Sequence, residues 1–235
     1  MKEFFRAHVP RDSFLYWLLV SIYRNPCLFV IAFFRSINAT RKLTGRLFPV
    51  KVCLGAGQRL NIFRSSKARV QIFGMLKVNP YIGYNAESSI HLRDESSFVV
   101  YGNFEIGPGV HIFLNRNAVL RIKGQVASTA SGITCDSRIM VENSIEIGSD
   151  CIIAWDVSIT DSDWHEIIDV PRNSPVVIGD NVWISHGVSI IKGANIPSGC
   201  IVGAKSLVGR GEFLNNALIA GVPARVKKVG VEWTR

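Results

Sequence analysis

The segment VIGDNVWISHGVSIIKGANIPSGCIVGAKSLVG, residues 177–209, carries an aliphatic residue at every sixth position. The series runs without interruption through Ile178, Ile184, Ile190, Ile196, Val202 and Val208. A period of six matches neither the 3.6-residue turn of an α-helix nor the two-residue alternation of an ordinary strand. It matches a coil of three short strands, in which each side of the coil points one aliphatic side chain into a narrow core.

The same period occurs upstream, but in a different phase. Ile147, Ile153 and Ile159 form a second series, and the stretch ITDSDWHEIIDVPRNSP, residues 159–175, separates it from the first. Ile106 and Ile112 share the step, and short β-rich runs begin near residue 60. The sequence therefore predicts one long coil with a polar insert. Periodicity alone leaves open a plain β-solenoid without catalytic chemistry.

Composition limits the choice of partners. The chain has 235 residues, is 48% hydrophobic and has a formal net charge of +9, with much of the excess positive charge at its ends. Such a charge fits an anionic lipid surface, a phosphorylated cofactor or nucleic acid. Because neither an aromatic RNA-binding signature nor a recognition-helix pattern accompanies the basic residues, we expect no nucleic-acid partner. Five scattered cysteines without CxxC pairs fit a reducing compartment.

The first 50 residues differ from the rest. Residues 13–36 are apolar, but Arg24, Asn25 and Pro26 interrupt them, so neither part reaches the ~18 to 20 residues of a membrane-spanning helix. Asn25 as N-cap and Pro26 as first helical residue predict two short helices. We therefore divide the chain into a helical segment at 1–50, a coil domain at 51–229 and a tail at 230–235. The helical segment fits a membrane-surface anchor or an end cap of the coil equally well.

The repeat, together with ALIAGVPARVKKV at residues 217–229, resembles the hexapeptide-repeat acyltransferases, in particular the galactoside and maltose O-acetyltransferase branch and its relatives in polysaccharide biosynthesis. The resemblance is strong over residues 145–229 and weaker over 60–144. It implies an all-β fold, a left-handed parallel β-helix of hexapeptide repeats with a short N-terminal helical segment. It also implies a homotrimer that binds acetyl-CoA between neighbouring prisms.

Acetyl transfer from a thioester to a hydroxyl requires a base that removes the hydroxyl proton, and a neutral imidazole typically contributes ~10² to 10⁴ in rate. His165 lies in the insert shortly before the VWI motif, where the related enzymes carry their catalytic histidine. Asp163 or Asp161 is then the candidate that orients the second ring nitrogen, although a backbone carbonyl can do the same in the family. Glu142 and Asn143 are candidate partners of the acceptor hydroxyls.

The resemblance also implies a donor site, with a slot for pantetheine and cations for the phosphates. Carried over residue by residue, it consists of Trp183, Ser185, His186, Gly203, Ala204, Gly209, Arg210, Arg225 and Lys228. His186 is equally well explained as a histidine at the trimer seam, and Trp183 as a packing residue. The relatives usually have Thr-Lys where this chain has Gly209-Arg210, so the charge is kept and the hydroxyl is lost.

The expected function is acetyl-CoA-dependent O-acetylation of a sugar or a cell-surface polysaccharide precursor, such as lipopolysaccharide or capsule. Alternatives are N-acetylation of an amino sugar, a serine acetyltransferase, a zinc protein like the β-helical carbonic anhydrases, and a non-enzymatic scaffold. No metal is expected, because the five histidines include no H-x4-H pair; they are His8, His91, His111, His165 and His186. The expected location is the cytoplasm, with residues 1–50 at the inner face of the cytoplasmic membrane.

Overall fold

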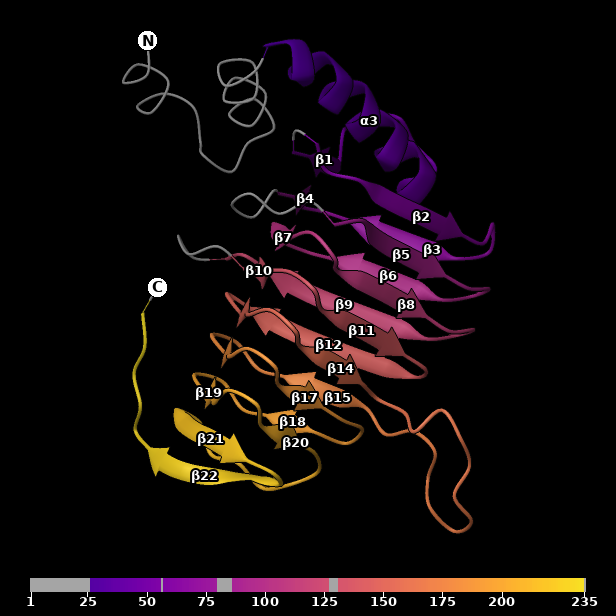
Figure 1. Ribbon diagram of the computed structural model, residues 1–235. Coiled ribbons are helices and arrows are strands. Elements are labelled where there is room, and N and C mark those ends of the chain that lie inside the picture. Colours follow the sequence, from indigo (N-terminus) through magenta and orange to yellow (C-terminus); the bar gives the residue numbers. More distant parts are fainter. Residues whose placement is uncertain (1–25, 56, 80–85, 127–130, 235) are drawn as a thin grey trace.

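The computed structural model describes residues 26–55, 57–79, 86–126 and 131–234 (Figure 1). The helix expected before Arg24 and the histidine at position 8 lie outside the described residues. The described chain winds as a three-sided coil whose sides are three sheets, here named A, B and C. Each turn of the coil adds one strand to each sheet, so each strand from β1 to β17 pairs with the strand three places later in the chain. At the end of the coil, β19 pairs with β21 and β21 with β22.

Sheet A contains nine strands, and only its last pair is antiparallel. They are β1 (Val52–Leu54), β4 (Leu76–Val78), β7 (Phe104–Ile106), β10 (Gly132–Ile133), β13 (Ile152–Ile153), β16 (Trp183–Ile184), β19 (Ile201–Val202), β21 (Ala217–Gly221) and β22 (Ala224–Val229).

Sheets B and C are parallel throughout. Sheet B contains β2 (Leu60–Arg64), β5 (Ser88–Leu92), β8 (His111–Leu114), β11 (Arg138–Val141), β14 (Ser158–Thr160), β17 (Ser189–Ile190) and β20 (Leu207–Val208). Sheet C contains β3 (Arg69–Ile72), β6 (Ser97–Val100), β9 (Val119–Gly124), β12 (Ser144–Ser149), β15 (Val176–Ile178) and β18 (Asn195–Ile196).

The six-residue period is confirmed as the step from one sheet to the next. Ile178 lies in sheet C, Ile184 in sheet A and Ile190 in sheet B, and the next three members of the series repeat that order. All six side chains are buried. The predicted left-handed parallel β-helix with an N-terminal helix is therefore confirmed.

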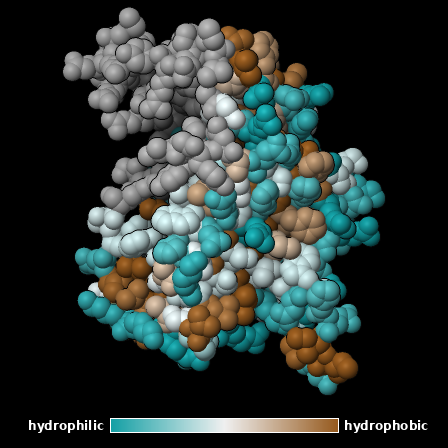
Figure 2. All heavy atoms as spheres, in the orientation of Figure 1, coloured by the Kyte–Doolittle hydropathy of each residue, from teal (hydrophilic) through white to brown (hydrophobic). Residues whose placement is uncertain are grey.

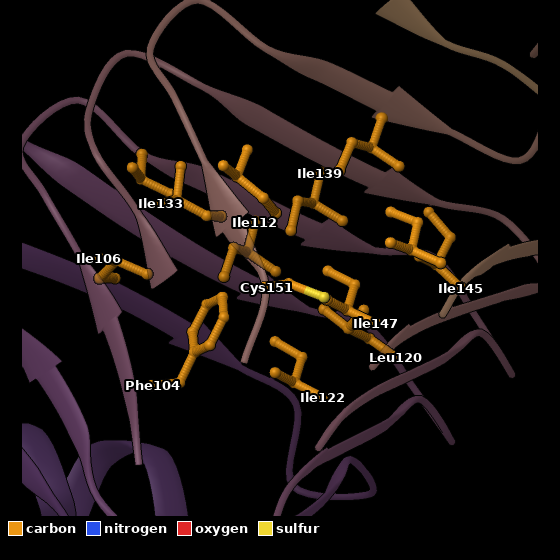
Figure 3. Close-up of a cluster of buried hydrophobic side chains, with 14 of the residues drawn as sticks. Phe104, Ile106, Ile112, Leu120, Ile122, Ile133, Ile139, Ile145, Ile147 and Cys151 are labelled. Carbon is orange, nitrogen blue, oxygen red and sulfur yellow. The ribbon is translucent and has the colours of Figure 1, made fainter. Parts of the chain in front are cut away.

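The core is a column of aliphatic side chains inside the coil. Figure 3 shows one level of it, where Phe104 of sheet A, Ile112 of sheet B and Leu120 of sheet C point toward one another. Each of these side chains is almost completely buried. Because every coil contributes the same kind of side chain from each sheet, the coils stack on a continuous apolar interior.

Helix α3 (Pro26–Thr44) covers the first coil (Figure 1). The predicted N-cap, Asn25, lies outside the described residues. Leu43 is completely buried in the core. The unpaired edge of β1 is covered as well, because the backbone N–H of Val52 donates to Thr40 Oγ1 at 3.0 Å and that of Leu54 donates to Ser36 Oγ at 2.9 Å. Helix α3 thus packs on the first coil through these contacts. None of the described helical residues forms a segment with the length and apolarity needed to cross a membrane.

The polar insert leaves the coil between β14 and β15, at the corner where sheet B turns into sheet C. It projects from the body of the molecule as a long loop (Figure 1). Its outermost part is apolar, with Ile167, Ile168 and Val170 exposed, and it forms the separate hydrophobic tip seen in Figure 2. The interruption of the sequence period therefore corresponds to an interruption of the coil.

Candidate active site

Asp161 fixes the start of the insert to the neighbouring coil. Its side chain is buried, and its two carboxylate oxygens accept hydrogen bonds from the backbone N–H groups of Glu142, Asn143 and Ser144 at 2.8, 2.8 and 2.6 Å. Burial raises the pKa of the Asp161 carboxyl, while the three N–H donors act in the opposite direction. Both oxygens thus accept hydrogen bonds from the corner between β11 and β12, and neither is bonded to the His165 ring within the described residues.

Trp164 holds the next part of the insert against sheet B. Its Nε1–H donates to Thr160 Oγ1 at 3.0 Å, and its backbone N–H donates to Ser162 Oγ at 3.0 Å. Its ring centroid lies 5.8 Å from that of Phe113. The backbone of Trp164 has a φ of 63°, a left-handed conformation that is uncommon for a bulky side chain. These contacts hold a strained turn immediately before His165.

His165 itself is exposed on the insert. Within the described part of the chain, its ring has no hydrogen-bond or ion-pair partner. The carboxylate of Asp163 pairs with Lys192, whose Nζ also donates to the carbonyl oxygen of Pro171 at 2.6 Å. Asp163 therefore ties the insert to the coil below it. Within the described residues, neither Asp161 nor Asp163 makes a hydrogen bond to the His165 ring; Asp161 is bound to the β11–β12 corner and Asp163 to Lys192.

Of the two candidate acceptor residues, Glu142 is already engaged. Its carboxylate pairs with Arg172, near the end of the insert, and accepts a hydrogen bond from Asn115 Nδ2 at 2.6 Å. The Glu142 side chain is only 10% exposed. Asn143 is exposed at the same corner. The structure thus assigns Glu142 to the attachment of the insert, and leaves the Asn143 amide accessible beside it.

Four of the expected donor-site residues gather at a second corner, where sheet A turns into sheet B. They are Ser185, His186, Gly203 and Ala204. The His186 carbonyl accepts a hydrogen bond from the backbone N–H of Lys205 at 3.0 Å, which stacks the two corners. The His186 ring lies parallel to that of Trp155, at a centroid distance of 5.1 Å and an interplanar angle of 13°. This corner therefore presents a flat aromatic surface with a lysine beside it.

The other expected donor-site residues are distributed over two places. Trp183, Arg225 and Lys228 lie on sheet A and are exposed. Gly209 and Arg210 follow β20 at the corner between sheets B and C, where Arg210 Nη2 donates to Ser174 Oγ of the insert at 3.3 Å. Sheet A and its corner thus combine two tryptophans with exposed cations, which fits a ligand that has both an apolar arm and phosphate groups.

The two halves of the expected site lie on different edges of the three-sided coil. His165 and Asn143 are at the corner between sheets B and C, whereas His186 and Ala204 are at the corner between sheets A and B. The whole width of sheet B separates these corners within one chain. A single chain therefore does not bring the candidate base to the candidate donor corner.

Several residues that shape this region were not identified from the sequence. Trp164, Arg172 and Lys192 hold the insert, and Trp155 forms the stack on His186. The one available signal was the position of Trp164 directly before the candidate base. The described residues contain no group of three or more His, Cys, Asp or Glu side chains that could hold a metal ion.

Comparison with known proteins identifies relatives. The chain is 32% identical over 152 residues to an Escherichia coli K12 protein named "Putative lipopolysaccharide biosynthesis O-acetyl transferase WbbJ", with 59% of this chain and 74% of that protein aligned. It is 29% identical over 141 residues to the polysialic acid O-acetyltransferase of Escherichia coli O1:K1, with 53% of this chain and 45% of that enzyme aligned. No family model matches the chain.

Among solved structures, the polysialic acid O-acetyltransferase OatWY aligns with 79% of this chain and 90% of its own, at 21% identity and a TM-score of 0.39. At this score the fold assignment rests on the strand order and register of the chain itself.

Proposed function

Because the chain belongs to the hexapeptide-repeat O-acetyltransferase family that includes WbbJ, we propose that it transfers an acetyl group from acetyl-CoA to a hydroxyl of a sugar in a cell-surface polysaccharide or its precursor. Membership of the family makes the chain an acyltransferase. The observation that carries the proposal is the exposed His165 on an insert that Asp161 and Trp164 fasten to the coil.

In the proposed mechanism, neutral His165 is the general base. Its unprotonated ring nitrogen takes the proton of the acceptor hydroxyl while that oxygen attacks the thioester carbonyl carbon. The tetrahedral intermediate then collapses with cleavage of the C–S bond, and the imidazolium returns the proton to the departing sulfur. The products are the O-acetyl ester and free CoA. The exposed amide of Asn143, at the same corner, is suited to hold a second hydroxyl of the acceptor.

The donor is proposed to lie along sheet A and its corner with sheet B. Trp183 and the stacked pair of Trp155 and His186 offer apolar faces for the pantetheine arm. Exposed Arg225 and Lys228 on β22 are placed to contact the phosphate groups.

The active site is proposed to form between copies of the chain in a homotrimer. His165 and the donor corner lie on different edges of one coil, so an adjacent copy is needed to bring them together. The apolar tip of the insert, including Ile168 with 88% exposure, has the character of a surface that a neighbouring copy covers.

The protein is proposed to work in the cytoplasm, with its N-terminal segment at the inner face of the cytoplasmic membrane. On α3, exposed Val30, Ile31 and Phe34 lie on the same helix as exposed Arg35 and Lys42. Apolar side chains interspersed with cations are typical of an interfacial helix.

The direct test is a screen of nucleotide sugars and lipid-linked glycans with acetyl-CoA, read by mass spectrometry. A product heavier by one acetyl group and labile to hydroxylamine supports O-acetylation. A stable product indicates acetylation of an amine, and the lack of any product contradicts the proposal.

A further inference from the structure

A row of aromatic side chains runs along the outer face of sheet B toward the insert. Phe63 of β2 is opposite His91 of β5, and His91 is opposite Phe113 of β8. Trp164 of the insert completes the row, which we call the aromatic row. The rings of Phe63 and His91 stack at 4.4 Å and 26°, and those of Phe113 and Trp164 lie at 5.8 Å.

The aromatic row ends at the candidate base, with Phe63 exposed and His91, Phe113 and Trp164 half-buried. Phe63 is 58% exposed although it lies on a regular strand. Burial and the neighbouring His111 lower the pKa of His91, which favours the uncharged form of its ring. Parallel strands are spaced by ~4.8 Å, and the row crosses two strand spacings from Phe63 to Phe113 before the Trp164 ring adds a further 5.8 Å. The row is therefore about 15 Å long. His165 directly follows Trp164, the last member of the row.

Cations accompany the aromatic row. A groove of about 670 Å³ beside Phe63, His91 and Phe113 is also lined by three arginines and a single carboxylate, namely Arg64, Arg93, Arg116 and Asp94. The groove therefore has an excess of two positive charges.

Among the described residues, two of these arginines have no carboxylate partner. Arg93 lies 5.5 Å from the Phe113 ring centroid, and Arg64 donates to the carbonyl oxygen of Ala68 at 2.8 Å. Arg116 is the one that pairs with Asp94, at 3.9 Å. A guanidinium group held beside an aromatic ring can bind a carboxylate or phosphate group through paired N–H hydrogen bonds as well as through its positive charge.

We propose that the aromatic row binds an extended anionic saccharide chain and leads it to His165. The inference deepens the proposed function, on which it rests, by naming the class of acceptor. The C–H faces of successive sugar rings would pack on the aromatic rings, while Arg64 and Arg93 would pair with the acidic groups of the chain. A ligand that covers the whole row has to be longer than one sugar, because the row is about 15 Å long.

The test measures binding of oligosaccharides without acetyl-CoA, so it does not depend on catalysis. The probes are short polysialic acid oligomers and neutral dextran oligomers of matched length, and titration calorimetry gives the affinities. The variants are Phe63→Ala and Arg93→Ala. The matched control is Phe73→Ala, which removes a similarly exposed phenylalanine, 60% exposed and stacked on Tyr101 at 5.6 Å, from the sheet C side of the coil.

We expect the full-length protein to bind the polysialic acid oligomers more tightly than dextran. Phe63→Ala and Arg93→Ala should each weaken that binding by roughly 3- to 10-fold, and added salt should weaken it further. Phe73→Ala should bind like the unmodified protein.

Equal affinity of Phe63→Ala and the unmodified protein would overturn the inference, as would equal binding of the two probes. Dissociation of the oligomer in Phe63→Ala would also overturn it, because the row would then be an interface between copies. Binding that Phe63→Ala weakens, in a protein that acetylates none of the acceptors, would support the inference while contradicting the proposed function.

Discussion

Trp164 Nε1 donates a 3.0 Å hydrogen bond to Thr160 Oγ1, so the residue before the candidate base is fastened to the last residue of β14. Packing against Phe113 fastens the same indole to β8. The position of His165 therefore depends on a side chain that belongs to the insert but packs on the coil. We regard Trp164 as a positioning residue.

Replacing Trp164 should lower kcat without weakening the binding of acetyl-CoA. Trp164→Leu removes both the hydrogen bond and the ring contact, so we expect kcat to fall by roughly 10-fold or more while the KM for acetyl-CoA stays within a few-fold. Trp164→Phe keeps the ring and should recover part of the loss. Steady-state kinetics with varied acetyl-CoA give both constants. A Trp164→Leu enzyme with unchanged kcat would show that the indole does not position the base.

Asp161 should matter for stability more than Asp163 does. Asp161→Asn leaves the buried N–H groups of the β11–β12 corner without an adequate acceptor, which should lower the free energy of unfolding by ~1 to 3 kcal/mol. Asp163→Asn removes a partly exposed ion pair with Lys192 and should cost less than about 1 kcal/mol. Urea unfolding followed by circular dichroism compares the two variants. A larger loss of unfolding free energy in Asp163→Asn than in Asp161→Asn would contradict the greater structural role of Asp161.

The coil could be predicted from the sequence because its rule is local. The aliphatic residues from Ile178 to Val208 recur every six positions, and the place of each residue in that series determines the sheet on which it lies. The same residues are the buried ones. The attachment of the insert follows no such rule. Asp161 reaches back to Glu142, and Trp164 reaches back to Phe113, across coils whose corners differ in length. Sequence separation alone therefore does not reveal these contacts.

The aromatic row could not be predicted for the same reason. Phe63, His91 and Phe113 are separated by 28 and then 22 positions, because the intervening coils are irregular. Only the strand register places them side by side. The donor residues from Ser185 to Ala204 were easier to group, since regular coils of the repeat carry them.

Two inactive variants should restore activity when they are mixed. His165→Ala lacks the base but keeps the donor side, whereas Arg225→Glu keeps the base but has a disrupted donor side. A site formed between one copy of each variant can therefore contain an intact base and an intact donor side. Dissociation and reassembly of an equal mixture into trimers should recover about a quarter of the normal activity, since both halves are intact in about a quarter of the sites. Thiol release provides the readout, and each variant reassembled alone is the control. An inactive mixture of confirmed mixed trimers would indicate a site within one chain.

The role of His165 as the base is tested by comparing His165→Ala with His186→Ala for thiol release and acetyl-CoA affinity. In His165→Ala, we predict that turnover falls by ~10² or more, while donor affinity stays within a few-fold and the oligomer and melting temperature stay unchanged. In His186→Ala, donor binding should weaken, while turnover at saturating acetyl-CoA should stay close to normal. Near-normal turnover in His165→Ala, or a selective loss of turnover in His186→Ala, would contradict the assignment of His165 as the base.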